Sequence, residues 1–151
     1  MLRAWVAALL AVALSPAALP ALELDTADVA LLADLLAEGG YGRLPIERAA
    51  FLVLTPGGER RCVLWPVTAE LRAARFRGTI PPGTFAIAHT HPLDQPNPSP
   101  GDIATAESLG LPVIVITPRR IAAAVPFGGT EVLATGWWSR EAGAAACRDQ
   151  D

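Results

Sequence analysis

The alternation of apolar and polar residues along the chain predicts helices interspersed with strands. Apolar side chains recur with helical spacing over residues 27–38, and the pair Gly39-Gly40 ends that helix. The apolar runs 49–54 and 62–65 lie on either side of a Pro-Gly-Gly turn, so they predict a β-hairpin. The first half of the chain is therefore expected to form a helix followed by two antiparallel strands.

The second half of the chain continues with shorter elements. The threonine at position 68 is a good helix cap and predicts a short helix that runs to about residue 74. The other predicted elements are a buried strand at 85–88, a helix at 102–109, antiparallel strands at 113–117 and 121–125, and a last strand within 127–140. This order of elements predicts an α/β (α+β) fold in which helices sandwich a mixed β-sheet.

The chain has two histidines, His89 and His91, and both directly follow the predicted strand 85–88. Side chains two residues apart on a strand point to the same face, about 7 Å apart along the strand, so both imidazoles can reach one metal ion. Asp102 follows His91 after ten intervening residues that are rich in proline. Two histidines and one carboxylate suit Zn²⁺ and leave a fourth position open for water, as in catalytic zinc sites.

These residues also carry a resemblance to a known family. The pattern His-x-His, ten residues, Asp, with Pro92 after the second histidine and Ser99 three residues before Asp102, is similar to the metal signature of the JAMM (JAB/MPN+) metallopeptidases. The resemblance implies that His89, His91 and Asp102 bind zinc and that Ser99 helps to hold the tetrahedral intermediate. It also implies the three-layer, cytidine-deaminase-like fold, and it extends loosely over residues 25–125.

Ser99 and Asp102 also have an ordinary structural interpretation. A serine followed three residues later by an acid is a capping box, a common start of a helix. The two interpretations are compatible, because a helix that starts at Ser99 also fixes Asp102 in its first turn.

In the same family a glutamate activates the zinc-bound water. It stands at the start of the strand after the first helix, commonly with a proline two residues earlier, and Pro45-Ile46-Glu47 matches that position. Relatives usually carry glycine three residues after the glutamate, where this chain has Ala50. Glu38, at the end of the predicted helix, is the alternative. The helix dipole disfavours a carboxylate at that end, so a glutamate there can have been kept for a functional reason. Glu47 is the residue that we expect to act as the general base.

The first 21 residues have the parts of a secretory signal peptide. Arg3 provides a positive start, residues 4–14 are apolar and uncharged, and small residues lead to a cleavage point near Ala21. An uncleaved anchor is the alternative, although a membrane span needs about 20 apolar residues. We therefore expect an exported protein, periplasmic or secreted, in which residues 22–151 form one domain that is not integral to the membrane once the signal is removed.

Composition excludes several classes of function. Removal of residues 1–21 takes away one arginine and no acid, so the formal net charge falls from −3 to −4, which argues against nucleic acid as a partner. Every basic residue is arginine, which excludes Schiff-base chemistry at a lysine. Cys62 and Cys147 are too few for a cysteine-based zinc site. In an oxidising compartment they either form a disulfide or remain two separate thiols.

Together these features predict a zinc-dependent hydrolase of peptide or isopeptide bonds. Its substrate would be a peptide or protein, and export would place that substrate in the cell envelope. A non-catalytic metal-binding or scaffold module is the alternative, and iron or manganese could replace zinc. A nucleobase deaminase, which shares the implied fold, is set aside because it requires His-x-Glu and Pro-Cys-x-x-Cys motifs, which this chain lacks.

Overall fold

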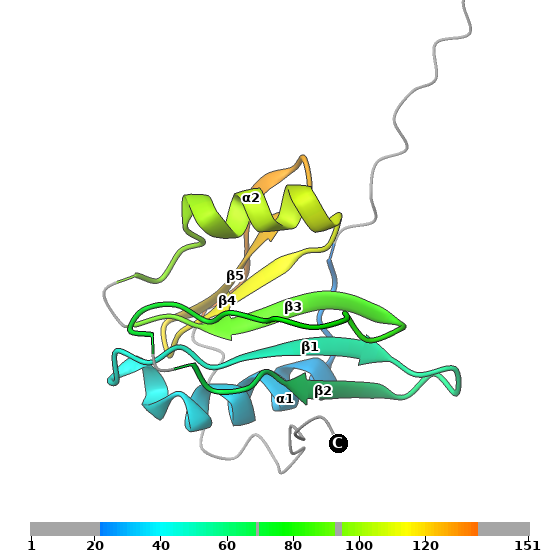
Figure 1. The fold of residues 1–151 in the computed structure, drawn as a ribbon, viewed down its shortest axis with the longest axis horizontal. Coiled ribbons are helices and arrows are strands. Elements are labelled where there is room, and N and C mark those ends of the chain that lie inside the picture. Colours follow the sequence, from blue (N-terminus) through cyan, green and yellow to red (C-terminus); the bar gives the residue numbers. More distant parts are fainter. Residues whose placement is uncertain (1–21, 69, 93–94, 136–151) are drawn as a thin grey trace, which may run out of the picture.

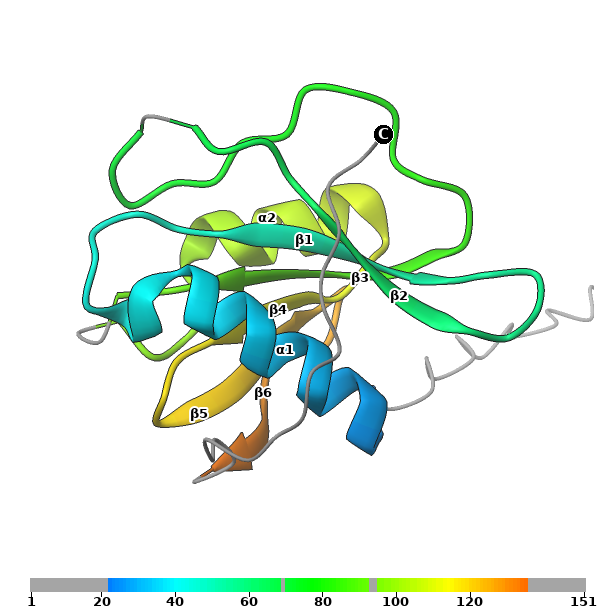
Figure 2. The ribbon, with the colours of Figure 1, turned by 90° about the horizontal axis from the view of Figure 1, so that it is seen from below.

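A six-stranded mixed sheet with one α-helix on each face forms the core of the protein (Figures 1 and 2). The computed structural model describes residues 22–68, 70–92 and 95–135. In chain order the elements are α1 (Thr26–Glu38), the 3₁₀ helix η1 (Gly40–Gly42), β1 (Ala49–Leu54), β2 (Arg60–Leu64), β3 (Thr84–Thr90), α2 (Pro100–Leu109), β4 (Val113–Ile116), β5 (Arg120–Val125) and β6 (Gly129–Thr135). This arrangement confirms the predicted α+β class and the mixed sheet between helices.

The strands are ordered β2-β1-β3-β4-β5-β6 across the sheet. All neighbouring pairs are antiparallel except β3 and β4, which are parallel. A parallel pair needs a crossover connection, and α2 provides it, so β3, α2 and β4 form a βαβ unit. In such units ligands commonly bind beyond the carboxyl end of the first strand, where the chain enters the helix.

Alternate residues of the central strands build two separate halves of the core. Leu52 of β1 and Ala88 of β3 pack against the leucines of α1, whereas Phe51 and Ile87 pack on the other face, with Ala106 of α2. Because side chains alternate along a strand, the odd-numbered residues from Ile87 onward face α2, and the even-numbered residues Ala86, Ala88 and Thr90 face α1. This alternation decides the environment of the residues at the end of β3.

Helix α1 begins with a capping box and is tied to the sheet by a buried carboxylate. Asp25 caps the helix and exchanges hydrogen bonds with Asp28, so two otherwise unpaired amides are satisfied. Asp28 is fully buried and accepts a hydrogen bond from the Arg60 guanidinium, which also lies 3.2 Å from Asp25. These contacts attach the start of α1 to β2.

The predicted short helix after Thr68 is wrong. In the part of this segment that the structure describes, the chain makes a turn at Leu71 and Arg72, and the Arg72 amide donates to the carbonyl of Pro45 across 2.8 Å. Arg72 has φ = 56°, in the left-handed region, which a helix cannot include. Val67 and Leu71 are 62% and 67% exposed, so this segment does not bury its two large aliphatic side chains.

Several predictions fall outside the described residues, namely the signal peptide 1–21, the tail after residue 135, and Cys147. Cys62, in β2, is disulfide-bonded, which excludes the two-thiol alternative for this residue. The predicted strand within 127–140 is present as β6 as far as Thr135. Within the ranges that the structure describes, neither helix combines the length and the apolar character needed to cross a bilayer.

Candidate metal centre

His89 and His91 lie at the carboxyl end of β3 on the face that α2 covers. His89 pairs with Ala49 of β1 and Val115 of β4, and the amide of His91 donates to the Ile116 carbonyl, so the pleat continues past the last strand residue. Both imidazoles therefore point the same way, as predicted. Their Nε2 atoms are 3.0 Å apart and their rings stack with centroids 4.7 Å apart.

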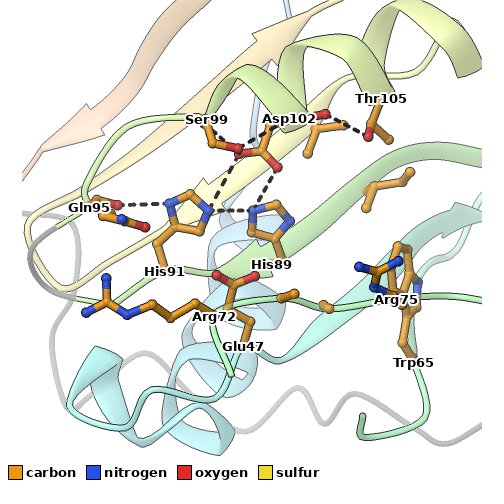
Figure 3. A pocket seen from close by; sticks show the side chains of 15 residues that line it. Glu47, Trp65, Arg72, Arg75, His89, His91, Gln95, Ser99, Asp102 and Thr105 are labelled. Carbon is orange, nitrogen blue, oxygen red and sulfur yellow. Dashed lines mark hydrogen bonds and ion pairs between the residues drawn. The ribbon is translucent and has the colours of Figure 1, made fainter. Parts of the chain in front are cut away.

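Asp102 reaches the same point from the first turn of α2. Its Oδ1 lies 3.3 Å from Nε2 of His89, and its Oδ2 lies 3.5 Å from Nε2 of His91 (Figure 3). Ser99 is the helix cap, and the capping box that the sequence predicts is complete. The Ser99 amide and hydroxyl donate to Oδ2 of Asp102 across 2.6 and 2.7 Å, so the cap holds the carboxylate in place.

The spacing of these atoms fits one small cation. With zinc–ligand bonds of about 2.0–2.1 Å, two ligand atoms of a tetrahedral site are about 3.3 Å apart. Here the two Nε2 atoms are 3.0 Å apart, and the carboxylate contacts them through different oxygens, Oδ1 at 3.3 Å from His89 and Oδ2 at 3.5 Å from His91. The three side chains thus converge on one point, where a cation could be held between the imidazoles and a carboxylate oxygen.

Glu47 adds a second carboxylate to the imidazole pair. It lies in the connector just before β1, and one of its oxygens, with one ring nitrogen from each histidine, forms a group whose atoms are all within 4.8 Å of one another. In Figure 3, Glu47 lies on the side of the two imidazoles opposite to Asp102. Glu47, His89, His91 and Asp102 are each 4–9% exposed. Glu47, His89 and His91 therefore form a buried group that could bind a metal ion.

The competing glutamate is placed elsewhere. Glu38, at the end of α1, accepts a hydrogen bond from the Arg48 guanidinium across 2.7 Å and is not among the residues that line the cleft at the histidines. An ion pair with Arg48 is a sufficient structural reason for its position. The geometry thus brings Glu47, and not Glu38, to the imidazole pair.

Burial controls protonation in this group. Desolvation by burial lowers the pKa of His89 to about 4. The Asp102 carboxylate opposes this effect and raises the pKa, but by less, and His91 lowers the pKa further. A neutral imidazole at neutral pH is the form that binds metals. Burial also raises the pKa of Glu47, against the opposing effect of His91, and Asp102 adds to the rise. A raised carboxyl pKa suits a residue that takes and returns a proton near neutral pH.

The tautomer of His91 is set by the backbone. Its Nδ1 lies 2.9 Å from the carbonyl oxygen of Gln95, and a carbonyl only accepts hydrogen bonds, so Nδ1 carries a hydrogen. The Nε2 lone pair is then directed at the site. Metal-ligating histidines commonly have such an outer partner. Because the partner is a main-chain oxygen, no side-chain motif in the sequence could have revealed it.

Thr90, between the two histidines, points to the opposite face and holds the segment that carries Glu47. Its hydroxyl accepts from the amide of Arg48 across 3.0 Å, and its own amide donates to the Arg48 carbonyl across 2.9 Å. Residue 48 is therefore bound at both backbone groups to the strand that carries the histidines. This clamp fixes the neighbouring Glu47 relative to the imidazoles.

Replacement of Thr90 by valine is expected to lower the free energy of unfolding by about 1–3 kcal/mol, because the shape is kept while a buried amide loses its acceptor. Urea unfolding of the metal-free protein measures this change. Thr130→Val, at an exposed site in β6, is the matched control and is expected to leave the midpoint almost unchanged. Equal urea-unfolding midpoints for the two variants would show that the Thr90–Arg48 hydrogen bonds do not stabilise the fold.

A cleft of about 490 Å³ opens over the centre. Its lining includes Glu47, both histidines, Ser99 and Asp102, together with residues from the segment after β2 that the sequence analysis did not single out: Trp65, Arg72, Ala73, Ala74 and Arg75. That segment also contacts the catalytic candidate, since the Ala74 amide donates a hydrogen bond to Glu47 and Arg72 lies close enough to lower its pKa. All five predicted site residues therefore line one cleft.

Comparison of the chain with protein-family models, with curated proteins and with solved structures gives no significant match. The function therefore has to be inferred from the geometry of this centre.

Proposed function

We propose that the protein is a zinc-dependent hydrolase of peptide or isopeptide bonds, of the JAMM metallopeptidase type. The convergence of the two buried imidazoles and the Asp102 carboxylate, with separations of 3.0–3.5 Å between their nitrogen and oxygen atoms, carries this proposal. In it, His89, His91 and Asp102 hold the ion, and one position stays open toward the cleft. Zinc bound there would polarise a carbonyl group and lower the pKa of water to about 7.

The side chains of the cleft supply the remaining chemistry of an amide hydrolase. The attacking water loses a proton to the Glu47 carboxylate, which returns it to the departing amine, so that an amide bond breaks and a carboxylate and an amine form. The Ser99 hydroxyl, when it turns from Asp102, donates to the carbonyl oxygen as negative charge develops there, a contribution typical of about 3 kcal/mol. Glu47 is held by a hydrogen bond from the Ala74 amide, whereas the Ser99 hydroxyl has to exchange its Asp102 partner for the substrate.

The substrate class follows from location and charge. The segment 1–21 has the composition of a signal peptide, so we propose export to the periplasm or the exterior and a peptide or protein substrate of the cell envelope. A mature net charge of −4 offers no attraction to nucleic acid.

Metal analysis joined to a peptide-cleavage assay tests the proposal. The purified protein that starts at Leu22 is expected to hold about one zinc per chain and to cleave amide bonds in a random peptide mixture. A chelator should stop cleavage, and zinc should restore it better than iron or manganese. Bound zinc without cleavage would favour the non-catalytic metal-binding module, and a folded protein that takes up no metal would reject both.

A further inference from the structure

A second hollow of about 470 Å³ opens directly beside the metal cleft. The two share the lining residues Trp65, Ala74, Arg75, Ile87 and Thr105, and we call these two adjoining hollows together the groove. The metal centre lies at one end of this groove and the second hollow at the other. Nothing in the chemistry described above uses the second end.

The lining of the second hollow is mainly apolar and aromatic. The ring of Phe51 lies 5.1 Å from that of Trp65 and 4.8 Å from that of Phe76, and the last two rings are 5.4 Å apart. Phe51 belongs to the core, whereas Trp65 and Phe76 are only half-buried. Ile80 and Ile87 complete the set. We call these five residues the aromatic pocket.

Both walls of the groove lead from the metal ligands to this pocket. On β3, Ile87 precedes His89 by two residues and faces the same side, about 7 Å along the strand. On α2, Thr105 follows Asp102 by three residues, about 4.5 Å along the helix. An extended peptide advances about 3.3 Å per residue. A side chain at the aromatic pocket would therefore belong to a residue within about two positions of an amide bond at the metal.

We propose that the aromatic pocket binds one large apolar side chain of the substrate, aromatic or long and aliphatic, within about two residues of the bond that is cut. This inference rests on the proposed amide hydrolysis and specifies its substrate class. Among the residues that the structure describes, the charged ones that line the second hollow are Arg75, which pairs with Glu70 across 2.6 Å, and Arg77. The positive charge of Arg77 disfavours a basic side chain, whereas that of Arg75 is offset by Glu70. The two phenylalanine rings offer no hydrogen-bond partner to a small polar side chain, and the rings' single polar group is the buried indole N–H of Trp65.

Sequencing of the products from a random peptide library tests the specificity. The zinc-loaded wild type is expected to prefer Phe, Trp, Leu or Met over Ala by about ten- to hundredfold at one position within two residues of the cut. Phe76→Ala should reduce that preference about tenfold while cleavage at small side chains continues. Phe127→Ala, the same change at a residue that is 81% exposed, is the matched control and should leave the preference unchanged. Cleavage without an apolar preference, or a preference that Phe76→Ala leaves unchanged, overturns the assignment.

A binding measurement separates failure of the pocket from failure of the hydrolase. Calorimetry with Glu47→Gln compares two acetylated pentapeptide amides that differ only in a central Phe or Ala. The Phe peptide is expected to bind at least tenfold more tightly, and Phe76→Ala should reduce that difference about tenfold. If no peptide is cleaved but this difference is found, the pocket stands and the proposed hydrolysis does not. Equal binding of the two peptides rejects the pocket as a substrate site. Peptide binding that weakens as the protein concentration rises also rejects it, because a second copy of the chain would then occupy the pocket.

Discussion

Replacement of Glu47 by glutamine is expected to leave the zinc content at one per chain and to lower kcat by about 10²–10⁴, the range that one general acid–base group contributes. Glutamine keeps the size of the side chain but cannot accept and return a proton. The carboxylate is well placed for that task, since it is buried beside both imidazoles and its pKa is raised by burial. Zinc analysis and steady-state kinetics on the same preparation measure the two properties separately.

Glu38→Gln is the matched control for this change. It removes a carboxylate that pairs with Arg48 outside the cleft, so kcat should stay within about twofold of the wild type, as surface pairs contribute little. The opposite pattern, an inactive Glu38→Gln beside an active Glu47→Gln, would move the base to Glu38. Loss of zinc from Glu47→Gln would instead indicate that Glu47 is a ligand of the ion and not only a base.

The second large effect is expected from replacement of the proposed zinc ligands. His91→Ala and Asp102→Asn should each weaken zinc binding by more than about a hundredfold, because even the outer partners of metal ligands are worth about 10–100-fold. In the wild type, zinc at a hundred times its dissociation constant should add about 2.7 kcal/mol of stability. That addition corresponds to a rise in Tm of about 10 °C, which both variants should lack.

Asp102→Asn is chosen over alanine because Asp102 has two roles. Its Oδ2 accepts from the amide of Ser99 as part of the helix cap, and an asparagine oxygen can still do so. Glu107→Gln, an exposed change on the same helix, is the control and should retain zinc and the thermal shift. A normal zinc content in Asp102→Asn would exclude this carboxylate as a ligand and leave Glu47 with the two histidines as the donor set.

Most of the fold could be predicted because its elements are defined by local patterns. The helix at 27–38, the hairpin of β1 and β2 and the antiparallel pair β4 and β5 all appear close to the predicted boundaries. The failed helix after Thr68 shows where local signals end. Its conformation is set by a hydrogen bond from Arg72 to Pro45, residues that are far apart in the sequence. Propensity cannot register such a contact.

The residues of the candidate site also divide into those that local sequence patterns predict and those that they do not. The closeness of His89 and His91 follows from the period of a strand, and Ser99 holds Asp102 through a cap that is visible in the sequence. The position of Glu47 could be suggested only by the resemblance, because it depends on β1 pairing with β3. Asp28 was not foreseen at all: a fully buried acid whose partner, Arg60, lies on another element has no local signature.

The clamp at Thr90 also limits how this sequence can diverge. Gly39 ends α1 with an ordinary φ of −78°, so its backbone would accept other residues. A Cβ atom there, however, would lie 2.7 Å from Oγ1 and 2.9 Å from Cγ2 of Thr90. Thr90 would have to shift, and it stands between two histidines. A larger residue at position 39 should therefore disturb the strand that carries the histidines, even though the helix itself would tolerate it.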